Sequence, residues 1–377
     1  MKKICFVLTV EFPVKVFLLD HLRALSKFYD LTVIVNTKNP SFLLENGVNA
    51  RLIPLGIARD ISLLSDLYCL FNLIKIFHEE NFSAVHSVMP KAGLLAMLAA
   101  WVARVPFRVH TFVGQVWVTQ TGYKRALLKQ LDCLIGYIAT LAIIDSPSQL
   151  QFLLDEKVIS AQKAVVFGKG SISGVNIKKF EFNLKTREET REILNISKDA
   201  IVFLFLARLI RDKGVLDLAN AWRNMPLTGA KLLLIGPDEQ NLLNDIKLIL
   251  GDKVSTVHFI GYTDSPESYV CASDVFCLPS YREGFGSILI QAAAGGVPSI
   301  ASRIYGITDA VIDGETGLLH EPRDINALKN CMQTLIDNKP LRLKLGEQAK
   351  ARAIKDFDSK VITQEWVNFY LKNVPLK

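Results

Sequence analysis

Residues 201–214 read Ile-Val-Phe-Leu-Phe-Leu-Ala-Arg-Leu-Ile-Arg-Asp-Lys-Gly, and the fold can be argued outward from them. Six consecutive apolar residues are typical of a strand buried on both faces, as in a parallel sheet that helices cover on both sides. Arg208 and Lys213 lie in the segment that separates this strand from a helical segment near 214–224. A helix amino terminus presents unpaired N–H groups and a positive dipole end, so cations there favour a phosphate site. A basic loop that merely caps a strand is an equal alternative.

Similar short apolar runs alternate with helical patterns along almost the whole chain, which predicts an α/β fold with parallel sheets. The expected strands are 3–10, 31–36, 50–54, 83–87, 107–111, 142–145 and 163–167, then 201–207, 230–236, 255–260, 274–279, 297–301 and 317–320. A turn-rich stretch near 168–174 separates the two sets. We therefore expect Rossmann-like domains over 1–180 and 181–355, with a final helix in 356–377. Ligands of such folds bind at the carboxyl ends of the strands.

Composition excludes several classes of protein. The chain has 377 residues and a mass of 42.1 kDa, which corresponds to two or three domains. Half of the residues are apolar, so disorder is excluded as the main state. No repeat of a solenoid or propeller is present. The six cysteines form no Cys-x-x-Cys pair and the histidines show no ligand spacing, so we expect reduced thiols and no metal site.

Neither the apolar start of the chain nor its longest apolar stretch is typical of a membrane-spanning segment. The start of the chain, with Lys2 and Lys3 before an apolar run, resembles a signal peptide, but Glu11 and Pro13 interrupt the run early. We expect a buried first strand there. The longest apolar stretch, 133–144, has 12 residues, whereas a spanning helix needs about 20.

Charge is distributed unevenly. Residues 1–187 hold 22 basic and 13 acidic side chains, and residues 188–377 hold 22 and 24. A basic first half favours an anionic partner such as nucleic acid, phospholipid or a phosphorylated substrate, with a basic solvated surface as the alternative. No nucleic-acid recognition motif accompanies it, so nucleic acid is not expected. The segment 121–144 starts with basic residues and continues apolar, which fits an interfacial membrane helix or an ordinary buried helix.

A second candidate site follows the expected strand 274–279. Residues 280–287 read Ser-Tyr-Arg-Glu-Gly-Phe-Gly-Ser, and a helix is expected to start near Ser287. The two glycines let the backbone approach a ligand, and the helix dipole favours an anion. Glu283 and Gln291 are eight residues apart, about 12 Å along a helix, so each could contact one end of a ligand. A strand–turn–helix that merely needs glycine is the alternative.

Together these pieces resemble the retaining glycosyltransferases of family 4, which have the GT-B fold. The likeness rests on a strand followed by Arg-x4-Lys-Gly, then Glu-Gly-Phe-Gly and Gly-Val-Pro, and it covers nearly the whole chain in the correct order. Further matching pieces are Asp313-Gly-Glu-Thr-Gly-Leu-Leu, Gly174-Val-Asn and Pro279-Ser. The resemblance implies two Rossmann-like domains that face each other across a cleft, with the donor in the cleft and a last helix packing back toward the first domain.

The resemblance also assigns roles to residues. Arg208 and Lys213 match the pair that binds the donor diphosphate, and Glu283 matches the carboxylate that contacts the donor sugar. His110 matches a histidine near the reacting centre, although a lone strand-end histidine is by itself more often structural. The implied catalytic residues are therefore His110 and Glu283. The implied donor-binding residues are Arg208, Lys213, Gly284, Phe285, Gly286, Ser287 and Gln291.

Two positions depart from the family pattern. Gln291 stands where the family has a second carboxylate that holds the ribose, and an amide offers one acceptor oxygen where a carboxylate offers two charged ones. The loop after the first strand reads Glu-Phe-Pro-Val-Lys at 11–15, where the family often has paired glycines.

The stretches around His86–Gly93 and His110–Trp117 resemble a bacterial subgroup that builds O-antigen or capsule repeats on polyprenyl diphosphate. Lys91 is then the implied acceptor-binding residue; a solvated first-turn lysine is the alternative. The resemblance implies transfer from a nucleotide-diphosphate sugar, UDP-linked, with retention and without metal or cofactor. The implied location is cytoplasmic, peripheral on the anionic inner face of the cytoplasmic membrane. A GT-B nucleotide-sugar epimerase and a non-catalytic membrane-associated scaffold are the alternatives.

Overall fold

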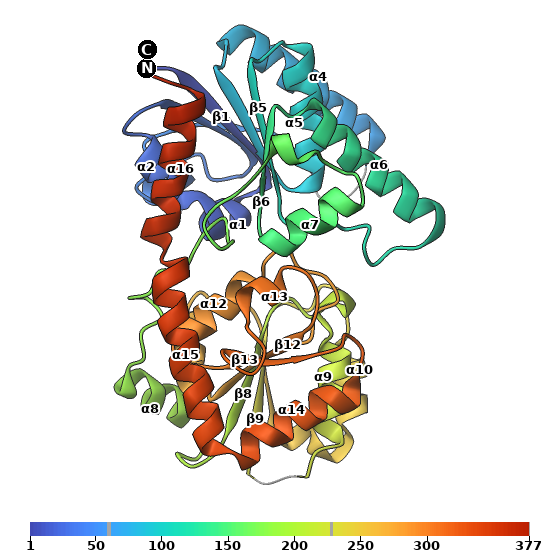
Figure 1. The fold of residues 1–377 in the computed structure, drawn as a ribbon, viewed down its shortest axis with the longest axis vertical. Coiled ribbons are helices and arrows are strands. Elements are labelled where there is room, and N and C mark those ends of the chain that lie inside the picture. The colour runs from blue at the N-terminus through green and yellow to red at the C-terminus, as the bar shows by residue number, and fades with distance from the viewer. Residues whose placement is uncertain (59–61, 227–228, 377) are drawn as a thin grey trace. The chain divides into compact units, whose positions relative to one another are not determined.

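The computed structural model describes residues 1–58, 62–226 and 229–376, and the chain divides into two compact units. The first unit comprises Met1–Gly174 and the chain from Ser359 onward, whereas the second is the continuous segment Val175–Asp358. The boundaries expected at 180 and 355 lie a few residues from these crossings. Each unit contains a parallel sheet with helices on both faces (Figure 1), as the strand–helix alternation predicts.

In the described part of the first unit, seven parallel strands form a sheet in the order β3-β2-β1-β4-β5-β6-β7. The strands are β1 (Lys3–Val10), β2 (Asp30–Asn36), β3 (Arg51–Pro54), β4 (Ala84–Val88), β5 (Phe107–Phe112), β6 (Leu141–Ile144) and β7 (Ala164–Val166). Every residue of β4 is buried, because helices cover both faces of the sheet at this strand. The strand order reverses between β1 and β4, which is the place where such sheets bind ligands.

Two hydrophobic cores cover the two faces of this sheet. One core lies under α4, α5, α6 and α7, and the other lies under α2, α3 and α16. The helical elements are α1 (Glu11–Pro13), η1 (Val14–Leu18), α2 (Leu19–Leu25), α3 (Phe42–Glu45), α4 (Leu63–Glu80), α5 (Pro90–Val102), α6 (Gly122–Ile138), α7 (Pro147–Asp155), η2 (Ala161–Lys163) and α16 (Ser359–Asn373). The segment 11–15, expected as a loop, is instead helical: α1 leads directly into the π-helical turn η1. No glycine is needed for this path, since the backbone stays in the right-handed region.

The last helix, α16, packs on the first unit, as predicted. It runs beside α2 (Figure 1) and fully buries the Trp366 and Tyr370 side chains. Two buried histidines hold it: His86 Nδ1 lies 2.6 Å from the Tyr370 hydroxyl, and the His21 ring stacks on Trp366 at 4.9 Å. Burial lowers the pKa of His21 from 6.5 to about 4, so this imidazole is neutral at pH 7.

In the second unit, the described residues form a six-stranded parallel sheet in the order β10-β9-β8-β11-β12-β13. The strands are β8 (Val202–Leu206), β9 (Lys231–Ile235), β10 (Val257–Ile260), β11 (Val275–Leu278), β12 (Ser299–Ser302) and β13 (Gly317–His320). The order reverses between β8 and β11, so the segments that follow these two neighbouring strands lie at a second switch point.

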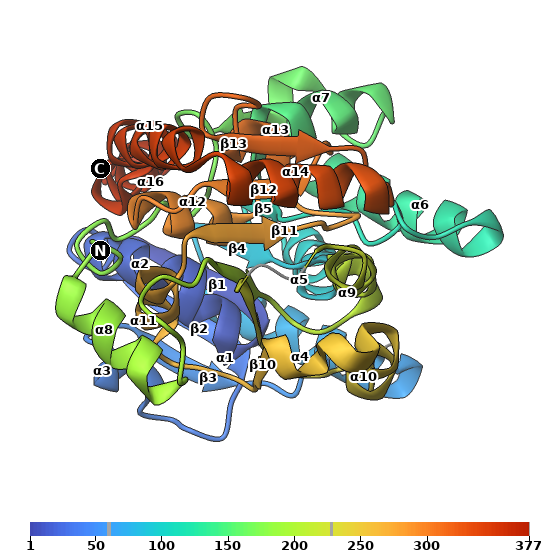
Figure 2. The same ribbon diagram turned by 90° about the horizontal axis from the view of Figure 1, so that it is seen from below.

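Helices again cover both faces of the sheet. One core lies under α9, α10 and α14, with α9 and α10 side by side in both views (Figures 1 and 2), and the other lies under α11, α12, α13 and α15. The helical elements are α8 (Leu184–Ile193), η3 (Arg211–Lys213), α9 (Val215–Arg223), α10 (Leu243–Leu250), η4 (Gly251–Thr256), α11 (Pro266–Ala272), α12 (Ser287–Ala294), α13 (Ile307–Ala310), α14 (Ile325–Asp337) and α15 (Lys339–Phe357).

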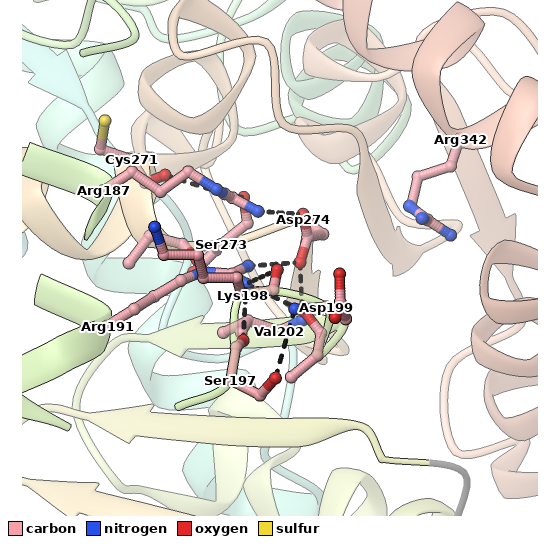
Figure 3. Close-up of polar contacts among 12 residues, drawn as sticks. Arg187, Arg191, Ser197, Lys198, Asp199, Val202, Cys271, Ser273, Asp274 and Arg342 are labelled. Atoms are coloured by element: carbon pink, nitrogen blue, oxygen red, sulfur yellow. Dashed lines mark hydrogen bonds and ion pairs between the residues drawn. The ribbon is translucent and has the colours of Figure 1, made fainter. Parts of the chain in front are cut away.

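An ion-pair cluster fixes α8 to the amino-terminal edge of this sheet (Figure 3). Asp274 accepts hydrogen bonds from Arg187 at 2.6 Å, from Arg191 at 2.8 Å and from the backbone N–H of Val202 at 2.8 Å. The Arg191 side chain is 4% exposed, and its remaining donors reach backbone carbonyls. Because both charges of the inner pair are compensated and hydrogen-bonded, the cluster is structural. It lies at the edge opposite to Glu283, which follows the carboxyl end of β11.

Within the described residues, no helix is both long enough and apolar enough to cross a membrane. The predicted apolar segment 133–144 is divided between the end of α6 and strand β6. Its second part is therefore a buried sheet strand rather than a continuation of the helix.

Candidate functional site

At the carboxyl edge of the second sheet, the segments after β8 and β11 bring Lys213 and Glu283 together. Lys213 closes the short 3-10 turn η3, and its Nζ lies 2.5 Å from Glu283 Oε1. The Ser280 hydroxyl donates to the same oxygen at 2.9 Å. The two side chains are 19% and 12% exposed, so the pair is mostly removed from water and held in one geometry.

Gly214 is the residue that lets these two segments meet. Its φ of +68° is in the left-handed region that favours glycine. A Cβ at this position would lie 1.9 Å from the Pro279 carbonyl oxygen, far inside van der Waals contact. The glycine of the Lys-Gly pair thus permits a close backbone approach that no side chain would allow.

The glycine turn after Glu283 opens α12. Gly286 has a φ of +76° and precedes Ser287, the first residue of the helix. None of the described side chains caps this helix start; the N–H of Leu289 donates to the Gly286 carbonyl, and the positive dipole end of the helix faces the turn. Phe285 is 1% exposed and packs edge-on against Phe357, which places its ring in the core rather than at a ligand surface.

Arg208 lies at the same edge but does not join the Lys213–Glu283 pair. Its guanidinium lies 2.6 Å from Glu239 Oε2, and the two side chains are about one third exposed. Glu239 was not predicted from the sequence, although it follows β9, the strand beside β8, and therefore had to lie at this edge. Gln291 lies on the second turn of α12 and is partly exposed.

In the first unit, His110 lies within β5 and is buried beneath α5. Its Nδ1 is 2.9 Å from the hydroxyl of Ser87, its partner residue on β4. A Cβ on Gly93 would lie 2.4 Å from the imidazole, so this helical glycine makes room for the ring. Burial lowers the pKa of His110 to about 3, and the ring is therefore neutral at pH 7.

Lys91 is the second residue of α5, which follows β4 as expected. Its Nζ lies 2.6 Å from Asp66 Oδ1 on α4, and the two side chains are 15% and 18% exposed. The lysine is thus not the solvated residue of the alternative interpretation. The turn before it is strained, because Met89 has a φ of +78°, a value that side chains rarely adopt.

None of the described residues forms a cluster of three or more histidine, cysteine, aspartate or glutamate side chains able to hold a metal ion. The charged groups at the carboxyl edge of the second sheet are lysine, arginine and single carboxylates, and they lie beside backbone turns. Such an arrangement suits an anionic ligand bound through hydrogen bonds and cations.

Comparison with known proteins gives consistent matches. The model of the family described as glycosyl transferases group 1 matches residues 186–352. The capsular polysaccharide biosynthesis glycosyltransferase CapM of Staphylococcus aureus is 32% identical over 325 residues, which are 85% of this chain and 84% of that protein. The UDP-Gal:alpha-D-GlcNAc-diphosphoundecaprenol alpha-1,3-galactosyltransferase of Escherichia coli is 26% identical over 339 residues, with 88% and 86% covered.

Among solved structures, HepE of Anabaena in complex with UDP and glucose superposes with a TM-score of 0.82 at 19% identity, covering 99% of this chain and 100% of that one. At this identity the likeness shows the fold alone. Together with the sequence matches, it identifies both the family and the architecture. The chain belongs to the group 1 glycosyltransferases and is a glycosyltransferase with the GT-B fold.

Proposed function

We propose that the enzyme transfers a sugar from a UDP-linked donor to a polyprenyl-diphosphate-linked saccharide, with retention, in the synthesis of an O-antigen or capsule. The observation that carries this proposal is the Lys213–Glu283 pair beside the uncapped start of α12. Names of relatives agree with it: the Escherichia coli protein is named for a UDP-galactose donor and a diphosphoundecaprenol-linked acceptor.

Lys213 can contact the sugar nucleotide and Glu283 at the same time. An ammonium group has three donors, so Lys213 can keep Glu283 and still donate to a phosphate oxygen. Both Lys213 and Ser280 contact Oε1 of Glu283, and none of the described residues donates to Oε2. Oε2 is then the acceptor that we assign to a hydroxyl of the donor sugar.

Departure of a nucleoside diphosphate leaves negative charge that must be stabilised. We assign this task to Lys213, Arg208 and the N–H groups at the start of α12, which are oriented before the reaction begins. Arg208 first has to leave Glu239, but exposed ion pairs contribute at most about 1 kcal/mol, so a diphosphate competes readily. No step of this scheme uses a metal ion.

His110 and Lys91 are assigned to the donor sugar and the acceptor. A neutral imidazole fits the first role, because it can donate or accept a hydrogen bond without placing a charge beside the sugar. Lys91 lies in the first turn of α5, where the helix start favours an acceptor phosphate, and Asp66 is the group from which such a phosphate would take the lysine. Retention fits attack on the face from which the diphosphate leaves, with that phosphate taking the acceptor proton.

We also propose that the first unit binds the inner face of the cytoplasmic membrane through α4. Leu63, Leu64, Leu67, Tyr68 and Phe71 on this helix are 50% to 84% exposed. They recur at helical spacing and form one apolar stripe, which is typical of interfacial helices. Asp66, the partner of Lys91, lies on the same turns of α4, so the stripe is next to the proposed acceptor phosphate site.

Segment 121–144 is a weaker candidate for this contact than the sequence indicates. Two of its basic residues are already paired, because Arg125 and Lys129 lie 3.1 and 2.5 Å from Glu156. Both cations also lie within 6 Å of the Trp117 ring. Arg125 and Lys129 thus share one carboxylate within the unit, whereas Lys124 is exposed.

A transfer assay tests the proposed reaction. Purified enzyme is incubated with a panel of nucleotide sugars and a polyprenyl-diphosphate saccharide, and both the released nucleotide and the lengthened lipid are measured. Lys213→Ala should lower kcat/KM by about 30-fold to several hundredfold, as loss of one oriented donor does. Arg211→Ala is the matched control, since Arg211 is in the same turn but 65% exposed. Release of nucleotide without lipid product, for every donor tested, would refute the assigned acceptor class.

A further inference from the structure

The segments after β8 and β11 are joined by more than the Lys213–Glu283 pair. The backbone N–H of Tyr281 donates to the Asp212 carbonyl at 2.8 Å, which extends the contact of these neighbouring strands beyond the sheet. The guanidinium of Arg282 lies 3.2 Å from Asp212 Oδ2. Asp212 precedes Lys213, and Tyr281 and Arg282 precede Glu283, so these contacts lie directly beside the pair.

A third contact ties the Tyr281 side chain to α9. Its hydroxyl donates to Asp217 Oδ2 at 2.7 Å, in the first turn of that helix. On the ring, the Arg323 guanidinium lies 4.8 Å from the centroid, within the range of a cation–π contact. Burial raises the pKa of Tyr281, and the nearby Asp217 raises it further, so the hydroxyl stays protonated and remains a donor.

These contacts restrict the two segments in different directions. The Tyr281 N–H bond fixes their register, the Arg282–Asp212 ion pair closes them on one side, and the Tyr281–Asp217 bond anchors one of them to a helix. We name this set of Asp212, Asp217, Tyr281 and Arg282 the loop clasp. The Arg282 and Asp212 side chains are 20% and 30% exposed, so their ion pair is partly shielded from water.

We infer that Asp212 and Tyr281 are positioning residues that hold Lys213 and Glu283 in the geometry that binds the donor. A lysine side chain has many rotamers, and ordering it at the moment of binding weakens affinity. The loop clasp orders the backbone on both sides of the pair beforehand. This inference rests on the proposed function, because it assigns Lys213 and Glu283 to the donor.

Two variants test the loop clasp without touching the donor-binding side chains. Asp212→Asn removes the ion pair with Arg282 but keeps the side-chain volume and the carbonyl that Tyr281 N–H uses. Tyr281→Phe removes only the hydroxyl that reaches Asp217. Each should weaken binding of UDP and raise KM for the UDP sugar about fivefold to tenfold, the change expected from one lost net hydrogen bond, with a smaller change in kcat. Asp212→Glu, which keeps the charge, should recover part of the affinity.

Asp245→Asn is the matched control, because Asp245 is an exposed carboxylate on α10 that lies 3.8 Å from Arg211. Arg211 is in the same turn, η3, as Asp212. The Asp245→Asn variant should bind UDP as the wild type does. Thermal unfolding of all variants separates lost positioning from lost folding. If Tyr281→Phe unfolds at the temperature of the assay, the Asp212 variants decide the question alone.

Combination with Lys213→Ala asks whether the loop clasp acts through the lysine. If it does, Tyr281→Phe and Asp212→Asn have little further effect once Lys213 is gone. Two outcomes would overturn the inference: wild-type UDP affinity in both single variants, or losses of affinity that simply add to the loss in Lys213→Ala. In either case a loss of activity in Lys213→Ala would still support the proposed function. If the wild type neither binds UDP nor transfers from any nucleotide sugar, the proposed function fails and the inference falls with it.

Discussion

Gly214→Ala is the substitution for which the structure allows the sharpest prediction. Gly214 has a φ of +68°, and a Cβ there would lie 1.9 Å from the Pro279 carbonyl oxygen and 2.7 Å from its carbon. Real Cβ contacts stay beyond 3.0 Å, so the two segments have to move apart by at least about 1 Å. The obstacle is backbone at the end of β11, which cannot rotate away as a flexible side chain would.

Two effects contribute to the expected magnitude. An alanine in the left-handed region costs about 1–2 kcal/mol of folding free energy. The separation of the segments acts on function instead, because Lys213 is the adjacent residue and its ammonium group moves away from Glu283. A misplacement of about 1 Å can lower the rate about 100-fold, so kcat/KM should fall by that order while most of the protein stays folded.

Gly251→Ala is the matched control for this experiment. Gly251 also has a positive φ, +58°, but nothing lies within 4 Å of a Cβ at that position. It should also lose stability in urea denaturation, because its ψ of −127° lies outside the left-handed helical region, but it should keep its kcat/KM. If Gly214→Ala retained the kcat/KM of the wild type with the same UDP affinity, the close approach of the two segments would have no role in donor binding.

Four further predictions follow from other parts of the structure. Gln291→Glu should tighten UDP binding up to about tenfold in calorimetry, since a charged acceptor makes the stronger hydrogen bond; unchanged affinity would show that Gln291 does not contact the nucleotide. Activity should persist in excess EDTA, and a loss that magnesium or manganese restores would contradict the metal-free scheme. Leu64→Glu should weaken sedimentation with anionic vesicles, whereas Leu248→Glu, at a similarly exposed position of α10, should not. Binding of the wild type should weaken with salt, and indifference to salt would point to a purely apolar contact. The pKa of His21 is about 4 in the folded protein and 6.5 as its ordinary value, so the unfolded chain binds the proton more tightly. The free energy of unfolding is therefore unaffected by this group above pH 6.5 and falls by about 3 kcal/mol as the pH falls to 4. Urea midpoints at pH 7 and 4.5 should therefore differ less in His21→Gln than in His78→Gln, an exposed control on α4, and equal differences would exclude this linkage.

The meeting of Lys213 and Glu283 could be predicted from the sequence for a simple reason. Each follows a buried strand within a few residues, and parallel strands end at the same edge of a sheet. The two strands, β8 and β11, are also neighbours in the sheet, so the segments that follow them lie side by side. The partner of Arg208 could not be predicted in the same way, because a long exposed side chain chooses among several carboxylates by rotamer, and Glu239 is one of several near that edge.

The exposed stripe of α4 was also beyond sequence reasoning. Its pattern places apolar residues around most of the helix, which predicts a buried helix as readily as an exposed one. Which face stays uncovered depends on how many other helices pack against that side of the sheet. For His110, by contrast, a signal was present: Gly93 interrupts an otherwise helical apolar run, and a glycine inside a helix often marks a close approach.

The return of α16 to the first unit has a consequence for synthesis on the ribosome. Residues 175–358 form a continuous unit and can complete their core as soon as they have emerged. The first unit, although translated earlier, lacks Trp366 and Tyr370 until the last segment arrives, and its core around Phe6 and His86 stays open to water. The half that is translated first is therefore the half that finishes folding last, and it is the one that must be shielded from aggregation in the meantime.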